Sequence, residues 1–160
     1  MKRQPIFMLS MFAMTLRATS VIAADAPQVD VAERIRGAHK VVVAKAVGVT
    51  PEWRTNVHGD RLIVSQIALA VEETLKGTPT SQMWLELEGG TIDGVTLVVS
   101  SLPSIRPGDR AVFFLDGTTS GTHVPHLKGL GIMKLDTDGR IRGSDLRLDD
   151  VRRLAAVAGR

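Results

Sequence analysis

The chain of 160 residues contains no cysteine, and this absence removes several kinds of chemistry. Disulfide bonds, thiolate metal sites, thiol nucleophiles and redox cycling all need the cysteine sulfur. A lipid attached to a cysteine after a signal sequence is excluded for the same reason. The fold must therefore be stabilised by packing.

Aromatic residues are also scarce. The chain has four Phe, two Trp and no Tyr. Phe7 and Phe12 lie in the N-terminal segment, which leaves Phe113 and Phe114 for the rest of the chain. Aliphatic side chains must therefore supply most of the core.

The N-terminal segment has the features of a secretory signal peptide. Two basic residues come first, a mostly apolar run follows over residues 5–16, and Ala24-Asp25-Ala26 offers a cleavage site between small residues. Arg17 ends the apolar run well short of the about 20 residues that a bilayer-spanning helix needs. We expect cleavage after Ala24 or Ala26, with residues 27–160 forming one domain in the periplasm or outside the cell.

Removal of residues 1–26 changes the charge balance. The whole chain has 20 Lys and Arg against 17 Asp and Glu, and this segment holds three basic residues and one acidic residue, which leaves 17 against 16. A nearly neutral protein has no electrostatic reason to bind nucleic acid or an anionic membrane surface. We therefore expect neither partner.

Short apolar runs that end on Gly or Pro predict a mainly β fold. The predicted strands cover residues 39–49, 62–75, 83–87, 95–99, 111–115 and 131–135, the last paired with 140–142 across an Asp-Gly turn. Residues 83–87 alternate strictly, so one face belongs to the core and the other is wet or functional. A short helix is predicted over 30–37 and an amphipathic helix over 148–158.

Four phrases in this pattern carry a family resemblance. They are a Val-rich strand, a long strand ending in Glu-x-Leu-Lys-Gly, the turn Gly-Gly-Thr-x-x-Gly, and Arg-x-Gly-Asp-Arg-x-Val-x-Phe-Leu. Together, over about residues 40–142, they resemble small exported bacterial β-barrel domains of the OB-fold or netrin-module type. The resemblance implies an OB-like barrel of five to seven strands. Metalloproteinase inhibitors of that architecture place an N-terminal cysteine on the catalytic zinc, and this chain has none.

Two histidines close together suggest metal chemistry. His123 and His126 flank Val-Pro after a flexible loop, and His39 or His58 could complete a site if the fold brings them near. The pair lies on no predicted helix, so it lacks the one-face geometry of a His-Glu-x-x-His zinc motif. The calcium-like phrase Asp136-x-Asp138-Gly139 is better explained as a hairpin turn. No Gly-x-Ser-x-Gly motif singles out a nucleophile.

Two tryptophans and one arginine are the candidate binding residues. Trp53 and Arg54 stand in a polar segment between the first two predicted strands, where an aromatic residue can anchor a partner or fold back over the barrel end. Trp84 shares a mixed face with two glutamates, and lies either on an exposed binding face or under the C-terminal helix.

These observations predict an exported, non-enzymatic binding module of the cell envelope, with no cofactor. Its partner would be a protein or a glycan, bound through loops at one end of the barrel or through an exposed sheet face. The alternative is a small periplasmic metal-binding protein or enzyme that uses His123 and His126.

Overall fold

The computed structural model describes residues 30–158. The predicted signal peptide and its cleavage site lie outside this range. Within it, no helix is both long and apolar enough to cross a membrane. The described residues are mainly β, as the sequence predicts, with a short helix before the first strand and a second helix after the last.

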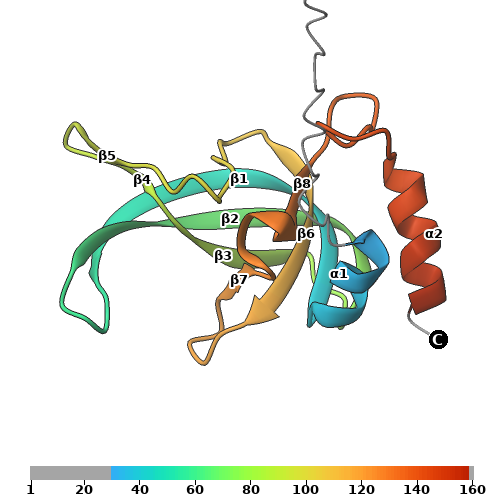
Figure 1. The fold of residues 1–160 in the computed structure, drawn as a ribbon, viewed down its shortest axis with the longest axis horizontal. Helices are drawn as coiled ribbons and strands as arrows, with labels where there is room; N and C mark the ends of the chain where they lie inside the picture. Colours follow the sequence, from blue (N-terminus) through green and yellow to red (C-terminus); the bar gives the residue numbers. More distant parts are fainter. Residues whose placement is uncertain (1–29, 159–160) are drawn as a thin grey trace, which may run out of the picture.

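Five strands form a ring. The sheet runs in the order β1-β2-β3-β7-β6, and β6 pairs again with β1, which gives an OB-like barrel (Figure 1). Neighbours are antiparallel, except that β3 and β7 are parallel. The short strand β8 (Ile132–Lys134) adds to β6. The ring strands are β1 (Lys40–Thr55), β2 (Arg61–Lys76), β3 (Gln82–Glu88), β6 (Arg110–Gly117) and β7 (His123–Pro125).

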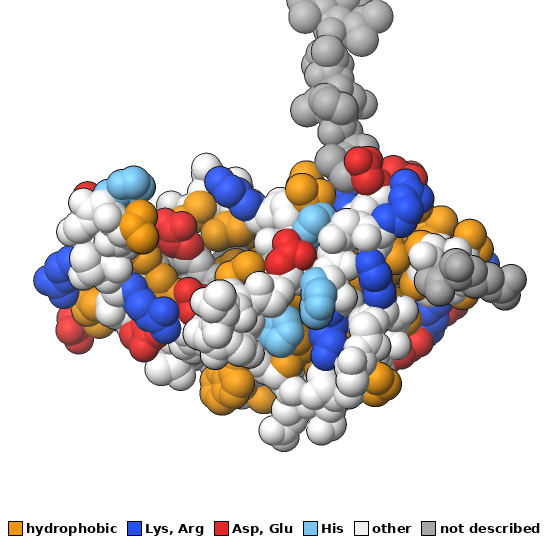
Figure 2. Space-filling model, turned by 90° about the horizontal axis from the view of Figure 1, so that it is seen from below, with side chains coloured by type: hydrophobic (Ala, Val, Ile, Leu, Met, Phe, Trp, Pro, Cys, Tyr) orange, Lys and Arg blue, Asp and Glu red, His pale blue; other side chains and the backbone are white. Residues whose placement is uncertain are grey.

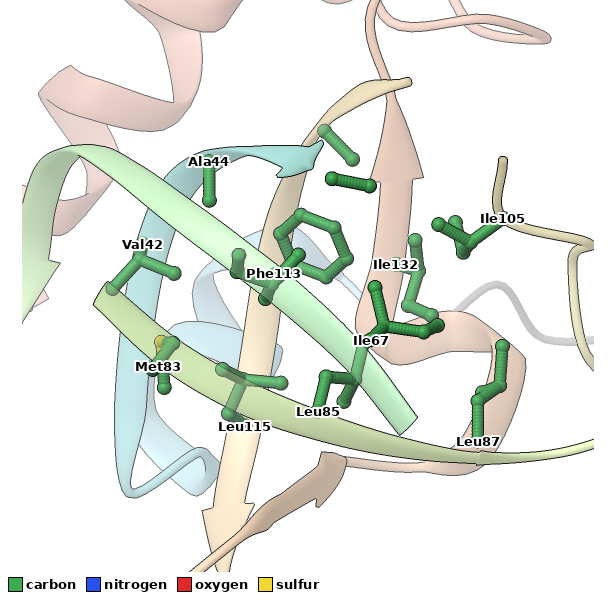
Figure 3. Packing of buried hydrophobic residues seen from close by; sticks show 13 residues of the cluster. Val42, Ala44, Ile67, Met83, Leu85, Leu87, Ile105, Phe113, Leu115 and Ile132 are labelled. Carbon is green, nitrogen blue, oxygen red and sulfur yellow. The ribbon is translucent and has the colours of Figure 1, made fainter. Parts of the chain in front are cut away.

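Both faces of β1 and β6 are buried where these strands pair. One face fills the barrel, and Val42, Ala44 and Phe113 lie there (Figure 3). The other face carries Val43 and Phe114 and is covered by α1 (Val31–Gly37) and α2 (Leu148–Ala158). The helices therefore cover one end of the molecule, while the β1–β2 hairpin projects from the other (Figure 1).

Lys76 joins α1 to the barrel. Its ammonium group donates hydrogen bonds to the carbonyl oxygens of Ile35, Arg36 and Ala38, at 2.9, 2.9 and 2.7 Å. A cation at a helix C-terminus satisfies carbonyl groups that have no partner within the helix. The lysine of the Glu-x-Leu-Lys-Gly motif thus caps the C-terminus of α1.

Strand β1 is longer than the sequence predicts. It continues through Thr50 and Pro51 to Thr55, and Pro51 lies opposite Ser65 of β2. The expected end at Thr50-Pro51 is wrong because β6 pairs only with residues 40–45 of β1. Beyond that point β1 has a free edge, where the missing N–H of proline breaks no ladder.

The predicted hairpin at residues 131–142 is present, but its paired segment is short. Gly139 donates to the carbonyl of Asp136 at 3.2 Å, and the Asp136 carboxylate accepts from the amides of Asp138 and Arg140. A single bridge joins Leu135 to Ile141. The Asp136 amide donates to the Arg140 carbonyl and the Arg142 amide to the Lys134 carbonyl, at 2.9 Å each, while the opposite edge of β8 pairs with β6. Strand β8 therefore has a partner on each of its two edges.

The predicted strand at 95–99 lies outside the barrel sheet. Its first three residues form β5 (Val95–Leu97), which pairs with β4 (Gly90–Ile92) in a separate two-stranded ribbon. Asp93 and Gly94 connect the two strands with φ of +50° and +80°. Positive φ at both positions fits a type I′ hairpin turn.

Candidate binding cleft

A cleft opens at the barrel end away from the helices. Its volume is about 610 Å³, and it lies between β1, β2, the β4–β5 ribbon and residues 98–107. The floor is apolar and continues the barrel core, whereas the rim carries polar and charged groups. The floor residues are Val49, Ile67, Leu87, Leu102 and Ile105, three of which appear in Figure 3, and the rim includes Glu88, Thr91, Thr96, Ser104 and Arg106.

The Gly89-Gly90 pair sets the first wall of the cleft. Gly89 donates to the carbonyl of Ile63 at 2.8 Å and accepts from the buried Ser65 hydroxyl at 2.7 Å. Gly90 has φ of +145°, and a Cβ there would lie 2.7 Å from Ser65 Oγ. Only glycine permits so close an approach with this backbone conformation. The β4–β5 ribbon is therefore fixed against the β1–β2 hairpin.

The phrase Arg106-Pro107-Gly108-Asp109 fixes the second wall. Asp109 donates its amide to the carbonyl of Arg106 at 3.0 Å, and φ of +94° at Gly108 makes this a type II turn. Burial would raise the pKa of the Asp109 carboxyl. Hydrogen bonds from Lys134 and from the Arg106 amide outweigh burial and lower that pKa. The turn therefore holds a carboxylate that anchors residues 98–107.

The structure separates Trp53 from Arg54. Both belong to β1 and not to a loop, so their side chains point to opposite faces. Trp53 lies opposite Ile63, and the Arg61 guanidinium carbon lies 4.5 Å from the centroid of its ring. This cation–π contact leaves Trp53 38 % exposed. The neighbouring Arg54 forms ion pairs with Glu52 at 2.5 Å and Glu86 at 3.3 Å.

Trp84 lies on the outer face of the sheet together with Arg54. Its side chain is 55 % exposed, which favours the binding-face interpretation over packing beneath α2. In the strand register Trp84 lies opposite Ala68, and Ala68 lies opposite Gly48, so small neighbours flank the indole. We call this surface the Trp84 face; it comprises Gly48, Ala68, Trp84, Gln66, Glu86 and Arg54.

Polar groups of the Trp84 face form a connected network. Gln66 donates to Glu86 at 3.0 Å, and Glu86 pairs with Arg54. Arg54 and Glu86 also line a second hollow of about 490 Å³, to which Lys128 adds another charge. That hollow lies across residues 99–102 from the cleft, since both share Leu87, Glu88, Val99 and Leu102.

Three of the four histidines come together near the start of β1. His126 Nδ1 lies 2.8 Å from one Asp116 oxygen, and the other oxygen accepts from the His39 amide at 3.3 Å. Burial lowers the pKa of His123, and the charges of Lys40 and His39 lower it further. Figure 2 shows histidine side chains gathered on one face. His58 lies in the distant β1–β2 turn.

This histidine cluster lacks the arrangement of a metal site. Within residues 30–158, no group of three His, Asp or Glu side chains is placed to hold an ion. One His126 nitrogen is bonded to Asp116, while the other faces Gly37, where a Cβ would lie 2.6 Å from Nε2. The metal interpretation of His123 and His126 stays a prediction.

Comparison with models of protein families gave no match to this chain, and comparison with curated proteins gave none either. The site is therefore described from its own geometry.

Sequence reasoning missed the cleft. Its walls come from residues 49–51, 65–67, 87–91 and 96–107, which are distant in the chain. The available signals were the Gly-Gly pair and the Arg-Pro-Gly-Asp phrase, since both mark close backbone approach or tight turns. They indicate where the chain bends, but not which segments meet.

Proposed function

We propose that this chain is an exported, non-enzymatic binding module of the cell envelope, and that the barrel-end cleft holds an apolar side chain of a protein partner. The cleft is the observation that carries the proposal. Its volume of about 610 Å³ lies in the range of about 300–1,000 Å³ that is usual for ligand sites. An apolar floor with a few polar groups at the rim is also typical of such sites.

A protein side chain suits this cleft better than a sugar. Burying a Leu, Ile or Phe side chain contributes about 1.5–3 kcal/mol, and the floor residues are aliphatic. The Ser65 hydroxyl beside them already donates to the Gly89 carbonyl. Glu88 and Arg106 on the rim carry opposite charges, which orient a polar peptide backbone or a charged neighbour. The anchored walls reduce the entropy lost on binding.

The test is a capture experiment with matched tryptophan substitutions. Ser104→Trp places a large side chain on the cleft rim, and Ser120→Trp places the same side chain in the exposed β6–β7 loop. We expect an envelope protein to be recovered by the wild type and by Ser120→Trp, but not by Ser104→Trp, and purified partner to repeat this order in calorimetry. Equal recovery by both variants would exclude the cleft.

The Trp84 face supports a glycan as a second candidate ligand. An exposed indole flanked by Gly48 and Ala68 leaves an aromatic surface open to the apolar face of a sugar ring, while Gln66 and Glu86 can bond hydroxyl groups. OB-folds also bind oligosaccharides on the face of their second and third strands.

The two tryptophans allow a direct test of glycan binding. In a Trp53→Phe variant, Trp84 is the chain's single tryptophan and its fluorescence reports on this face alone. Titration with soluble oligosaccharides from the host envelope should shift its emission. The matched Trp84→Phe variant, which keeps Trp53, should show no shift, and a response there instead would contradict this ligand site.

A further inference from the structure

The β4–β5 ribbon has an unpaired outer edge. Among residues 30–158, β5 pairs with β4 and with no other strand. The pairs are Ile92 with Val95, Thr91 with Thr96, and Gly90 with Leu97. In a two-residue hairpin the pair next to the turn exchanges both hydrogen bonds, and the following pair exchanges none. The amide and carbonyl of Thr96 therefore point away from β4, along the free edge.

Val98 extends this edge by one more set of backbone groups. Strand β5 ends at Leu97, and continued alternation through Val98 would direct its amide and carbonyl to the same side as those of Thr96. Neither group makes a hydrogen bond with another described residue. The side chain of Val98 is 79 % exposed and that of Val95 is 52 % exposed. The edge thus combines unused backbone groups with open apolar surface. The ribbon projects beside the β1–β2 hairpin (Figure 1), and Thr96, Leu97 and Val98 also line the cleft.

This edge lacks the devices that usually prevent strand pairing. Proteins protect edges with Lys, Pro, inward-pointing charges or bulges. Residues 95–102 contain no charged residue and no proline. A two-stranded ribbon is also only marginally stable by itself, whereas three or more strands support one another.

We propose that the occupant of this edge is a second copy of the chain, paired antiparallel with β5 about a two-fold axis at Leu97. In this register Thr96 of each copy lies opposite Val98 of the other, and the two pairs exchange four main-chain hydrogen bonds. Val95 lies opposite Val99, which covers exposed valine surface. The two ribbons become one four-stranded sheet.

Charge favours a second copy as the occupant. Self-pairing places identical segments against each other, so any charge within the segment would meet its like or lie close to it. This segment has none, and the chain turns away at residues 99–102, where the Leu102 amide donates to the Val99 carbonyl at 3.0 Å. The contact is short, so we expect a weak dimer that forms only at high protein concentration.

Sedimentation velocity over a range from about 10 µM to about 1 mM covers the dissociation constants of so small an interface. We expect the wild type to shift from monomer to dimer across this range. Val98→Pro removes an amide that has no internal partner, and Val98→Lys places two positive charges across the interface. Both variants should stay monomeric. Val57→Lys is the matched control because Val57 is 95 % exposed at the β1–β2 turn, and it should dimerise like the wild type.

Amide hydrogen exchange gives an independent readout. The amides of Thr96 and Val98 should exchange more slowly as concentration rises, while those of the β1–β2 turn stay unchanged. A wild type that remains monomeric throughout would overturn the proposal, and so would a dimer that survives in Val98→Lys or is lost in Val57→Lys. Protection that appears elsewhere than 95–99 would overturn it as well. Thermal unfolding of each variant confirms that the barrel is intact. This proposal does not depend on the ligand of the cleft.

Discussion

At the scale of single residues, Lys76 holds the end of α1 with three hydrogen bonds. Lys76→Met should lower the free energy of unfolding by about 1–3 kcal/mol, because three carbonyl groups at the end of α1 lose a charged donor. Urea denaturation measures this change. Lys45→Met is the control, since Lys45 is an exposed residue of β1, and it should change stability much less. Equal losses in both variants would show that the cap contributes little.

The second prediction at this scale concerns His123 and pH. Burial lowers the pKa of this imidazole, with smaller contributions of the same sign from Lys40 and His39, while the carbonyl of Trp84 acts in the opposite direction. The unfolded chain therefore binds a proton more readily than the folded protein. The resulting stability is present above the ordinary histidine pKa of about 6.5 and is lost as pH falls below it.

The measurement is the unfolding free energy as a function of pH. Between about pH 7.5 and about pH 5.5, the wild type should lose more stability than His123→Gln, whose side chain does not titrate. Parallel curves for the two proteins would mean that His123 is equally easy to protonate in both states.

At the scale of the elements, the position of the β4–β5 ribbon depends on the close approach of the Gly90 backbone to Ser65. Gly90→Ala places a methyl group 2.7 Å from Ser65 Oγ, so the ribbon must move and the hydrogen bond from Ser65 to Gly89 should break. We expect a loss of about 1–3 kcal/mol in unfolding free energy and faster amide exchange over residues 90–99. Gly94→Ala is the matched control, because Gly94 also has positive φ but no atom lies near its Cβ position. If both variants behave alike, strain at φ and not crowding is responsible.

The elements also show what sequence can and cannot determine. The predicted helix over 148–158 matches α2 at both ends, because its apolar spacing is a local property. Residues 83–87 and 111–115 are strands for the same reason. The extension of β1 beyond Pro51 depends on which edge lacks a partner, and the pairing of β8 with β6 joins segments that are not adjacent in the chain. Neither is local.

In the candidate site, too, the local features could be predicted from the sequence and the tertiary ones could not. Strand alternation was enough to predict that Trp84 shares a face with Glu86. The sequence predicts Trp53 and Arg54 as binding residues in a polar segment between two strands, and the unexpected length of β1 places them on opposite faces of the sheet. The cleft required knowledge of tertiary contacts, since Ser65 and Gly90 meet across two strands. Spacing in the sequence does not contain that information.

At the scale of the whole molecule, the two ends of the barrel are packed differently. The helices and the histidine cluster lie where β1 begins, and the cleft lies where β1 and β2 leave the barrel. Packing around α1, Asp116 and His126 is dense, since Gly37 touches the imidazole. The open end has the hollow and the free edge. The binding that we propose at the cleft would therefore leave the contacts between the helices and the barrel undisturbed.

The dense packing around His126 gives a prediction about zinc binding to the intact protein. A metal that binds only the folded state raises the melting temperature by mass action. We expect zinc to leave the melting temperature unchanged, because Asp116 already bonds one nitrogen of His126 and Gly37 crowds the other. Thermal unfolding with zinc and with a chelator measures this effect. A zinc-dependent rise that disappears in His126→Ala would instead favour the metal-binding alternative, and the functional centre would then lie at the closed end of the barrel.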